Sequence, residues 1–154
     1  MPDWDTDRAA RIIADHKHLA GATMPILHAL QEAFGYVDRS AIPAIADAVN
    51  LSQAEIFGVV TFYHDFRREP AGRHTIKLCR AEACQSVGAV ALADHAKRRL
   101  GVGWHGTSAD GQVTLEPVFC LGLCACGPSA LIDGEPVSLL DAASFDEHLA
   151  GLRT

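Results

Sequence analysis

Two stretches that end in paired cysteines decide the fold: Thr75–Cys84 reads TIKLCRAEAC, and Gln112–Cys124 reads QVTLEPVFCLGLC. Each stretch opens with apolar and β-branched residues that predict a strand, over about 75–79 and 112–118. A loop with two cysteines follows each strand. If the two strands are neighbours in a sheet, both loops lie at the same end of it. Four thiolates then converge on one centre: Cys79, Cys84, Cys120 and Cys124.

The residues between and after these strands predict a small α/β unit. A helix is expected over 86–100, with the cations Lys97–Arg99 near its C-terminal dipole and Gly101 as its terminator. Asp133-Gly134 is the turn signal of a hairpin between strands at 129–132 and 136–139. A last helix is expected over about 142–152. The order β-α-β-β-β-α, with room for a further element in 103–110, suits a thioredoxin-like α/β domain.

The first 65 residues predict four helices instead. Apolar positions recur at helical spacing from about Asp5 to Leu19, so the face of this helix that carries them, Leu19 included, is expected to be buried. The second helix is expected over 24–34 with Thr23 as its cap, and the third begins near Ser40. Ser52-Gln53-Ala54-Glu55 is a capping box that opens a fourth helix through about residue 60. The run 56–63 is nearly all apolar. It therefore also suits a buried strand, and its burial is expected in either case.

Residues 67–73 (RREPAGR) have the composition of a linker, so a domain boundary is expected near Pro70. The predicted organisation is a helical bundle in residues 1–70 followed by a thioredoxin-like α/β domain in residues 71–154. The apolar run 56–63 is larger than a 65-residue bundle needs for its own core. The helical domain is therefore expected to dock against a partner.

Four thiolates in two pairs suit a [2Fe–2S] cluster, because each iron takes two ligands and soft sulfur matches iron better than carboxylate or imidazole does. The expected ligands are the four cysteines named above. Glycines at 88, 122 and 127 allow the backbone to approach closely, so amide N–H groups can point at the sulfurs. The apolar residues expected to exclude water are Leu121, Leu123 and Pro128.

Other kinds of cysteine site share parts of this spacing. A structural zinc site also takes four cysteines, and spacing alone does not separate it from an iron cluster. A thiol-disulfide enzyme fits less well, because C-x-x-C is missing and only Cys124-Ala125-Cys126 comes close. A plant-type ferredoxin has the step from Cys79 to Cys84, but its following C-x₂-C is absent.

Composition narrows the function classes further. The 154 residues carry a formal charge of −6, and neither half is basic, so nucleic-acid binding is not expected. No apolar window is long enough for membrane insertion, and the acidic start MPDWDTDRAA is unlike a signal peptide. We therefore expect a cytoplasmic protein. No G-x-G-x-x-G or P-loop pattern indicates a nucleotide site or an active site of the chain's own.

These motifs resemble those of the thioredoxin-like [2Fe–2S] ferredoxins, including the 24-kDa-type subunit of NADH dehydrogenase. The resemblance rests on the two cysteine motifs, Cys79-x₄-Cys84-x₃-Gly88 and Cys120-Leu121-Gly122-x-Cys124-Ala125. Two segments of the helical half support it, Leu30–Tyr36 (LQEAFGY) and Glu55–Tyr63 (EIFGVVTFY). The segments Val60–Phe66 (VTFYHDF) and Cys79–Cys84 (CRAEAC) most resemble those of the gamma subunit of soluble, NAD-dependent molybdenum formate dehydrogenase.

The resemblance implies an electron-transfer subunit without catalytic residues of its own. It implies one partner that is a flavoprotein binding FMN and NAD(H), and another that is a larger catalytic subunit with iron–sulfur and molybdenum centres. Related subunits occur in NAD-reducing hydrogenases and NADH:quinone oxidoreductases. The family motif places its fourth ligand at Cys124, so the fifth cysteine, Cys126, is expected not to be a ligand.

Overall fold

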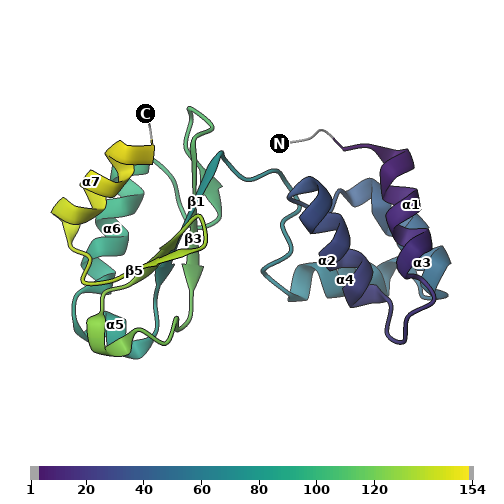
Figure 1. Cartoon of the computed structure of the whole chain (residues 1–154), viewed down its shortest axis with the longest axis horizontal. Helices are drawn as coiled ribbons and strands as arrows, with labels where there is room; N and C mark the ends of the chain where they lie inside the picture. Colours follow the sequence, from purple (N-terminus) through teal and green to yellow (C-terminus); the bar gives the residue numbers. More distant parts are fainter. Residues whose placement is uncertain (1–3, 153–154) are drawn as a thin grey trace. The chain divides into compact units, whose positions relative to one another are not determined.

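The computed structural model describes residues 4–152, and contacts within the chain divide it into two compact units, residues 1–70 and 71–154. The first unit is helical, and the second contains a five-stranded sheet with helices packed on it (Figure 1). The predicted mixture of a helical half and an α/β half is therefore present. Within the described residues, no helix is long and apolar enough to cross a membrane.

The helical unit contains four α-helices whose ends carry recognisable signals. Asp5 caps the first helix by accepting a hydrogen bond from the Arg8 N–H, and Asn50 ends the third with φ 55°. The capping box of Ser52 and Glu55 opens the fourth, so the run that also suited a strand is a helix. Thr23 is the first residue of its helix rather than its cap. The elements are α1 (Thr6–His16), α2 (Thr23–Phe34), the 3₁₀ turn Arg39–Ala41, α3 (Ile42–Val49) and α4 (Gln53–Phe62).

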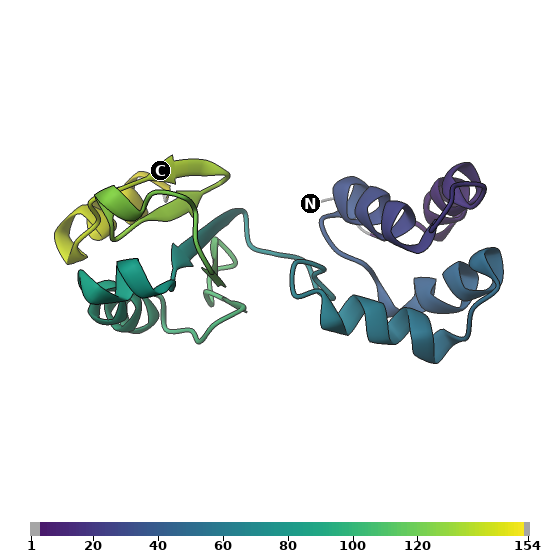
Figure 2. The ribbon, with the colours of Figure 1, turned by 90° about the horizontal axis from the view of Figure 1, so that it is seen from below.

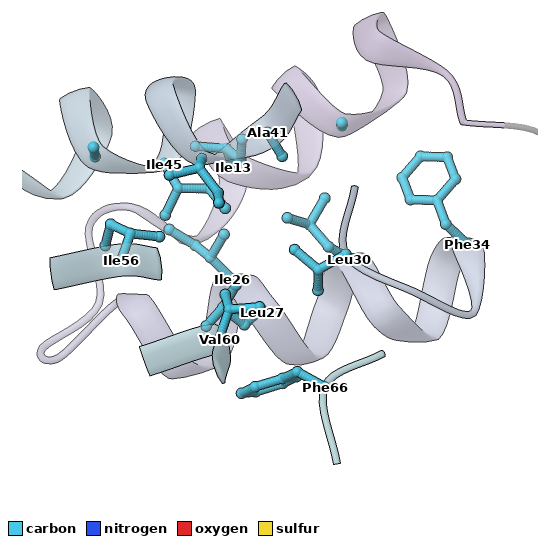
Figure 3. Packing of buried hydrophobic residues seen from close by; sticks show 14 of the residues in the cluster. Ile13, Ile26, Leu27, Leu30, Phe34, Ala41, Ile45, Ile56, Val60 and Phe66 are labelled. Carbon is cyan, nitrogen blue, oxygen red and sulfur yellow. The ribbon is translucent and has the colours of Figure 1, made fainter. Parts of the chain in front are cut away.

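The core of the helical unit lies between two layers, α1 with α2 and α3 with α4 (Figure 2). Ile26, Leu27, Ile45 and Ile56 are fully buried and point toward one another (Figure 3). Each such side chain contributes roughly 1.5–3 kcal/mol on burial.

Two expected burials in the helical unit are wrong. Of the run 56–63, only Ile56 and Val60 are buried, whereas Phe62 is 73% exposed. The reason is geometric, because α4 presents only one face to the bundle. Leu19 is also exposed, because α1 ends at His16 and Leu19 lies beyond it.

The sheet of the second unit has the order β2-β3-β1-β4-β5. Its two longest strands, β1 (His74–Cys79) and β3 (Val113–Val118), are parallel neighbours, while the other pairs are antiparallel. The predicted hairpin is confirmed, with Asp133 (φ 52°) and Gly134 (φ 91°) in its turn. The remaining strands are β2 (Gly106–Thr107), β4 (Ala130–Ile132) and β5 (Glu135–Val137).

The helices of the second unit are α5 (Glu82–Ser86), α6 (Ala89–Leu100) and α7 (Ala142–Leu152). Helices α6 and α7 lie on one side of the sheet, over a core that includes Ile76 and Phe145 (Figure 1). The helix predicted over 86–100 is wrong at its start. Gly88 takes φ 105°, which interrupts the chain between α5 and α6. As a result, Cys84 lies in a separate short helix rather than in a loop.

Candidate metal centre

The parallel pairing of β1 with β3 places both cysteine loops at one end of the sheet. The register aligns Cys79 with Val118, two residues before Cys120. The Arg80 N–H continues this pairing beyond the strands, with a 2.7 Å hydrogen bond to the Val118 carbonyl. The predicted neighbouring strands and shared sheet end are therefore confirmed.

The first cysteine pair is buried. Cys79, at the end of β1, is 3% exposed, and Cys84, in α5, is 1% exposed. The hydroxyl of Ser129 lies 3.5 Å from the Cys84 sulfur. A Cβ at Gly127 would lie 3.3 Å from the same sulfur and 3.0 Å from the Val87 Cγ2 atom. The expected close approach of the backbone at Gly127 is thus present, and it involves both Cys84 and Val87.

The second pair is exposed to solvent. The sulfurs of Cys120 and Cys124 are 3.8 Å apart. This separation equals the edge of a tetrahedron of thiolates around one metal, which is about 3.8 Å for a metal–sulfur bond of ~2.3 Å. The Gly122 N–H donates to the Cys120 sulfur at 3.4 Å, as expected for an amide that stabilises thiolate charge. Cys124 begins the short 3₁₀ helix Cys124–Cys126.

The environment shifts the pKa of one thiol in each pair, Cys79 and Cys124, and the two shifts have opposite directions. Burial opposes ionisation of Cys79, but hydrogen bonds from the Ala81 N–H, the Cys84 thiol and the N–H groups of Cys120 and Leu121 outweigh it, so its pKa lies below the ordinary value. The pKa of Cys124 is raised, chiefly by its hydrogen bond with Cys120 and by the charge of Cys120. The charges of Cys84 and Cys79 act on Cys124 in the same direction.

The donor set suits a two-metal cluster. The other three thiols all act on Cys124, and backbone N–H groups face the sulfurs of Cys79 and Cys120. Between residues 4 and 152, no group of three or more His, Cys, Asp or Glu side chains is spaced to share one metal ion. The four thiols are arranged in two pairs, because the sulfurs of Cys120 and Cys124 lie 3.8 Å apart and the Cys84 thiol hydrogen-bonds Cys79. Two ligands for each of two irons is the pattern that a [2Fe–2S] cluster needs.

Cys126 differs from the four cysteines of the two pairs. Its main chain is fixed on both sides, because its N–H donates to the Leu123 carbonyl at 3.0 Å and its carbonyl accepts from the Leu139 N–H at 2.8 Å. Its thiol is exposed and, among the described residues, forms no hydrogen bond with the other four sulfurs.

Sequence reasoning missed part of this site. It did not find helix α5, nor the N–H groups of Ala81, Cys120 and Leu121 around the Cys79 sulfur. The segment around residues 80–86 showed only the spacing of its cysteines, which does not predict a helix. No sequence signal identifies which amides face a sulfur. Leu121 and Leu123, expected to exclude water, are only half-buried.

Three histidines form hydrogen bonds away from the cysteine site. His95 hydrogen-bonds Asp146 at 3.1 Å, and His74 hydrogen-bonds Asp133 at 2.6 Å. His16 contacts the Ile12 carbonyl at 2.8 Å, within its own helix.

The chain is similar to known proteins over most of its length. The family model of the thioredoxin-like [2Fe-2S] ferredoxin matches residues 9–153. A subunit of the NADH-quinone oxidoreductase of Pseudomonas aeruginosa is 37% identical over 114 residues, which cover 74% of this chain and 69% of that protein. Its counterpart in Escherichia coli (strain K12) is 34% identical over 128 residues, which cover 83% of this chain and 77% of that protein. The counterpart in Mycobacterium tuberculosis (strain H37Rv) is 32% identical over 139 residues, which cover 86% of this chain and 55% of that protein.

A crystal structure of an NAD⁺-reducing [NiFe]-hydrogenase in the air-oxidized state shares the fold, with a TM-score of 0.67 and 29% identity. The match covers 82% of this chain and 22% of the hydrogenase chain. This chain thus spans about half of the Mycobacterium relative and about a fifth of the hydrogenase chain. The predicted thioredoxin-like α/β fold is confirmed by the family match.

Proposed function

The chain belongs to the thioredoxin-like [2Fe–2S] ferredoxin family and its cofactor is a [2Fe–2S] cluster, and on this premise we propose that Cys79, Cys84, Cys120 and Cys124 hold that cluster in a subunit that transfers electrons. When bound, the cluster accepts and releases one electron. The observation that carries the proposal is the meeting of two thiol pairs at one sheet end. Its strongest details are the 3.8 Å separation of the exposed sulfurs and the N–H groups around Cys79.

The chain's own residues prepare the site for a charged group. The Ala81, Cys120 and Leu121 N–H groups favour negative charge on the Cys79 sulfur. Such hydrogen bonds favour the reduced, more negative state of an iron–sulfur centre. The exposed pair leaves the other side of the site open to solvent and to a partner.

Composition of the purified holoprotein tests the cofactor and its ligands. We expect about two irons and two acid-labile sulfides per chain, visible absorption, and an EPR signal after one-electron reduction. A colourless protein containing zinc would contradict the proposal and support a zinc-stapled interaction module instead.

We further propose that the cluster exchanges electrons with the flavin of a partner that binds FMN and NAD(H). The larger complex is proposed to be a cytoplasmic, NAD-dependent formate dehydrogenase with a catalytic iron–sulfur and molybdenum subunit. The segments VTFYHDF and CRAEAC support the assignment to a formate dehydrogenase. The five free cysteines support the cytoplasmic location, because they suit a reducing compartment. The names of the relatives and of the structural neighbour support the alternatives, an NADH:quinone oxidoreductase or an NAD-reducing hydrogenase.

Isolation of the native complex distinguishes these assignments. A molybdenum-containing largest subunit and formate-dependent reduction of NAD⁺ are expected. Nickel in that subunit with hydrogen-dependent activity would favour the hydrogenase instead. A complex that transfers electrons from NADH to quinone would favour the third assignment.

We also propose that the helical unit docks on the flavoprotein through α4. Helix α4 exposes Phe57 and Phe62, and Tyr63, directly after the helix, is exposed as well. The Arg39 guanidinium lies 5.9 Å from the Phe57 ring centre. Large exposed apolar groups of this kind are typical of protein interfaces. The double variant F57S/F62S should lose co-purification with the flavoprotein while keeping its cluster spectrum. L19S, which also removes an exposed apolar side chain, is the matched control.

A further inference from the structure

Trp104 brings two cations together on the surface of the cluster-binding unit. The Arg80 guanidinium carbon lies 5.2 Å from the centre of the indole ring, and the Lys97 ammonium lies 4.5 Å from it. Both distances are within the range of cation–π attraction. The ring itself is half-buried and packs against the core of the unit, so it provides a fixed platform. The cations come from segments 17 residues apart in sequence.

Neither cation has a carboxylate partner in the part of the chain that the structure describes. Other basic residues of the same unit do have one, since Lys77 pairs with Glu116 and Arg99 with Asp146. Two like charges on one ring repel each other, and the ring's negative face offsets only part of that repulsion. An anionic group between or beside the two cations would offset the remaining repulsion.

The backbone around Arg80 is held in place. Its N–H donates to the Val118 carbonyl at 2.7 Å, and its carbonyl accepts from the Gln85 side-chain amide at 2.7 Å. Arg80 also directly follows the proposed ligand Cys79. A group bound by Arg80 therefore lies beside the loop that carries the cluster.

We infer that Arg80, Trp104 and Lys97 form an electrostatic docking surface for carboxylates on a protein partner. Charge complementarity defines the occupant as an acidic surface, and this chain's own charge of −6 makes a basic spot on it selective. Arg and Trp are frequent anchors of protein interfaces, and stacking on the indole reduces the entropy lost when the cations bind. Identification of the partner as the flavoprotein rests on the proposed function.

The test uses the full-length holoprotein and two probes, an end-blocked peptide of ten glutamates and the purified flavoprotein. Affinities are measured by calorimetry at low and at physiological salt for R80Q, K97Q and W104L. R98Q is the matched control, because Arg98 is an exposed cation on the same turn of α6 that does not contact Trp104. Visible absorption and EPR spectra of every variant confirm that the cluster is intact.

We expect R80Q and K97Q each to bind both probes about fivefold more weakly at low salt, with a flatter salt dependence. W104L, which keeps both charges but frees their side chains, should show a smaller loss. R98Q should bind like the unaltered chain. The surface is refuted if R80Q and K97Q bind as R98Q does, or if the unaltered chain does not bind the peptide.

The two probes also separate this inference from the proposed function. If the peptide distinguishes the variants but the flavoprotein binds none of the proteins, the surface stands and the assigned partner fails. If the flavoprotein binds every variant equally, the assigned partner stands and the docking surface fails.

Discussion

The two cysteine pairs occupy the same end of one sheet, yet their surroundings are opposite. Cys79 and Cys84 are almost fully buried, and N–H groups lower the pKa of Cys79. Cys120 and Cys124 face solvent, and the hydrogen bond with Cys120, followed by the charge of Cys120, raises the pKa of Cys124. The comparison indicates a division of labour. We propose that the buried pair anchors the site to the fold and that the exposed pair presents it to a partner.

The largest expected effect comes from replacing single cysteines with serine. Cys79→Ser, Cys84→Ser and Cys120→Ser should each lose most of the iron, because a hydroxyl is a poor ligand for a centre that favours soft sulfur. The stability of the cluster-free variants should distinguish the buried pair from the exposed pair. Cys79→Ser should lower the free energy of unfolding by about 1 kcal/mol, because it places a more polar group in a buried site, whereas Cys120→Ser should have little effect.

Iron analysis, EPR and denaturant unfolding of the apoproteins measure these outcomes. Equal stability losses for Cys79→Ser and Cys120→Ser would remove the distinction between an anchoring and a presenting pair.

A smaller effect is expected at Cys124, because Cys126 lies only two residues away and is exposed. We expect Cys126 to replace the lost ligand, so Cys124→Ser should retain a distorted cluster and be milder than Cys79→Ser. Cys126→Ser alone should remain near the unaltered protein in iron content and EPR signal. If Cys126→Ser loses the cluster while Cys124→Ser keeps a native signal, the fourth ligand has been assigned to the wrong cysteine.

A partial effect is expected from Gly127→Ala. Its Cβ would lie 3.3 Å from the Cys84 sulfur and 3.0 Å from Val87, so it presses on the buried pair. We expect faster loss of visible absorption in the presence of a chelator. Gly122→Ala tests the exposed pair, where a Cβ meets open space and only the φ of 76° costs about 1 kcal/mol.

The double variant G127A/V87A locates the source of the strain. If the added methyl acts on the Cys84 sulfur, removal of the Val87 side chain should leave the rapid loss unchanged. Full recovery of the normal rate would show that Val87 alone is responsible and that the sulfur of the buried pair is not disturbed.

The smallest expected effect concerns a single hydrogen bond to the buried pair. Ala81 has φ −72° and caps α5, so proline fits its backbone and removes only the N–H that faces Cys79. Ala81→Pro should lower the midpoint potential by roughly 10–50 mV, the equivalent of part of one net hydrogen bond. Ala81→Gly retains the N–H and serves as the control in the same redox titration.

The titration also gives the absolute potential. With four thiolates and no histidine ligand, the midpoint should lie well below the Rieske range of about −150 to +300 mV. A positive midpoint would be incompatible with the proposed ligand set. A Gly variant that shifts as far as the Pro variant would show that the N–H of Ala81 has no special role.

Much of the fold was predictable because its signals are local. The capping box at Ser52 and Glu55 and the turn at Asp133-Gly134 formed as expected, since each depends on residues next to one another. The errors arose where a contact between distant segments decides the outcome. Phe62 is as apolar as its buried neighbours, but it lies on the outer side of α4, where the edge-on ring of Tyr63 is near it and 73% of it stays exposed.

For the site, the sequence by itself determined which residues meet. Two strands, each followed by paired cysteines, were enough to place all four thiols at one sheet end, because parallel neighbouring strands share a direction. Only the tertiary structure decided which pair is buried, which amides face Cys79, and that Arg80 and Lys97 share the ring of Trp104. Burial and hydrogen bonding depend on segments that are far apart in the sequence, such as Cys79 and Ser129, whose main chains hydrogen-bond at 2.9 Å, and no local pattern encodes those contacts.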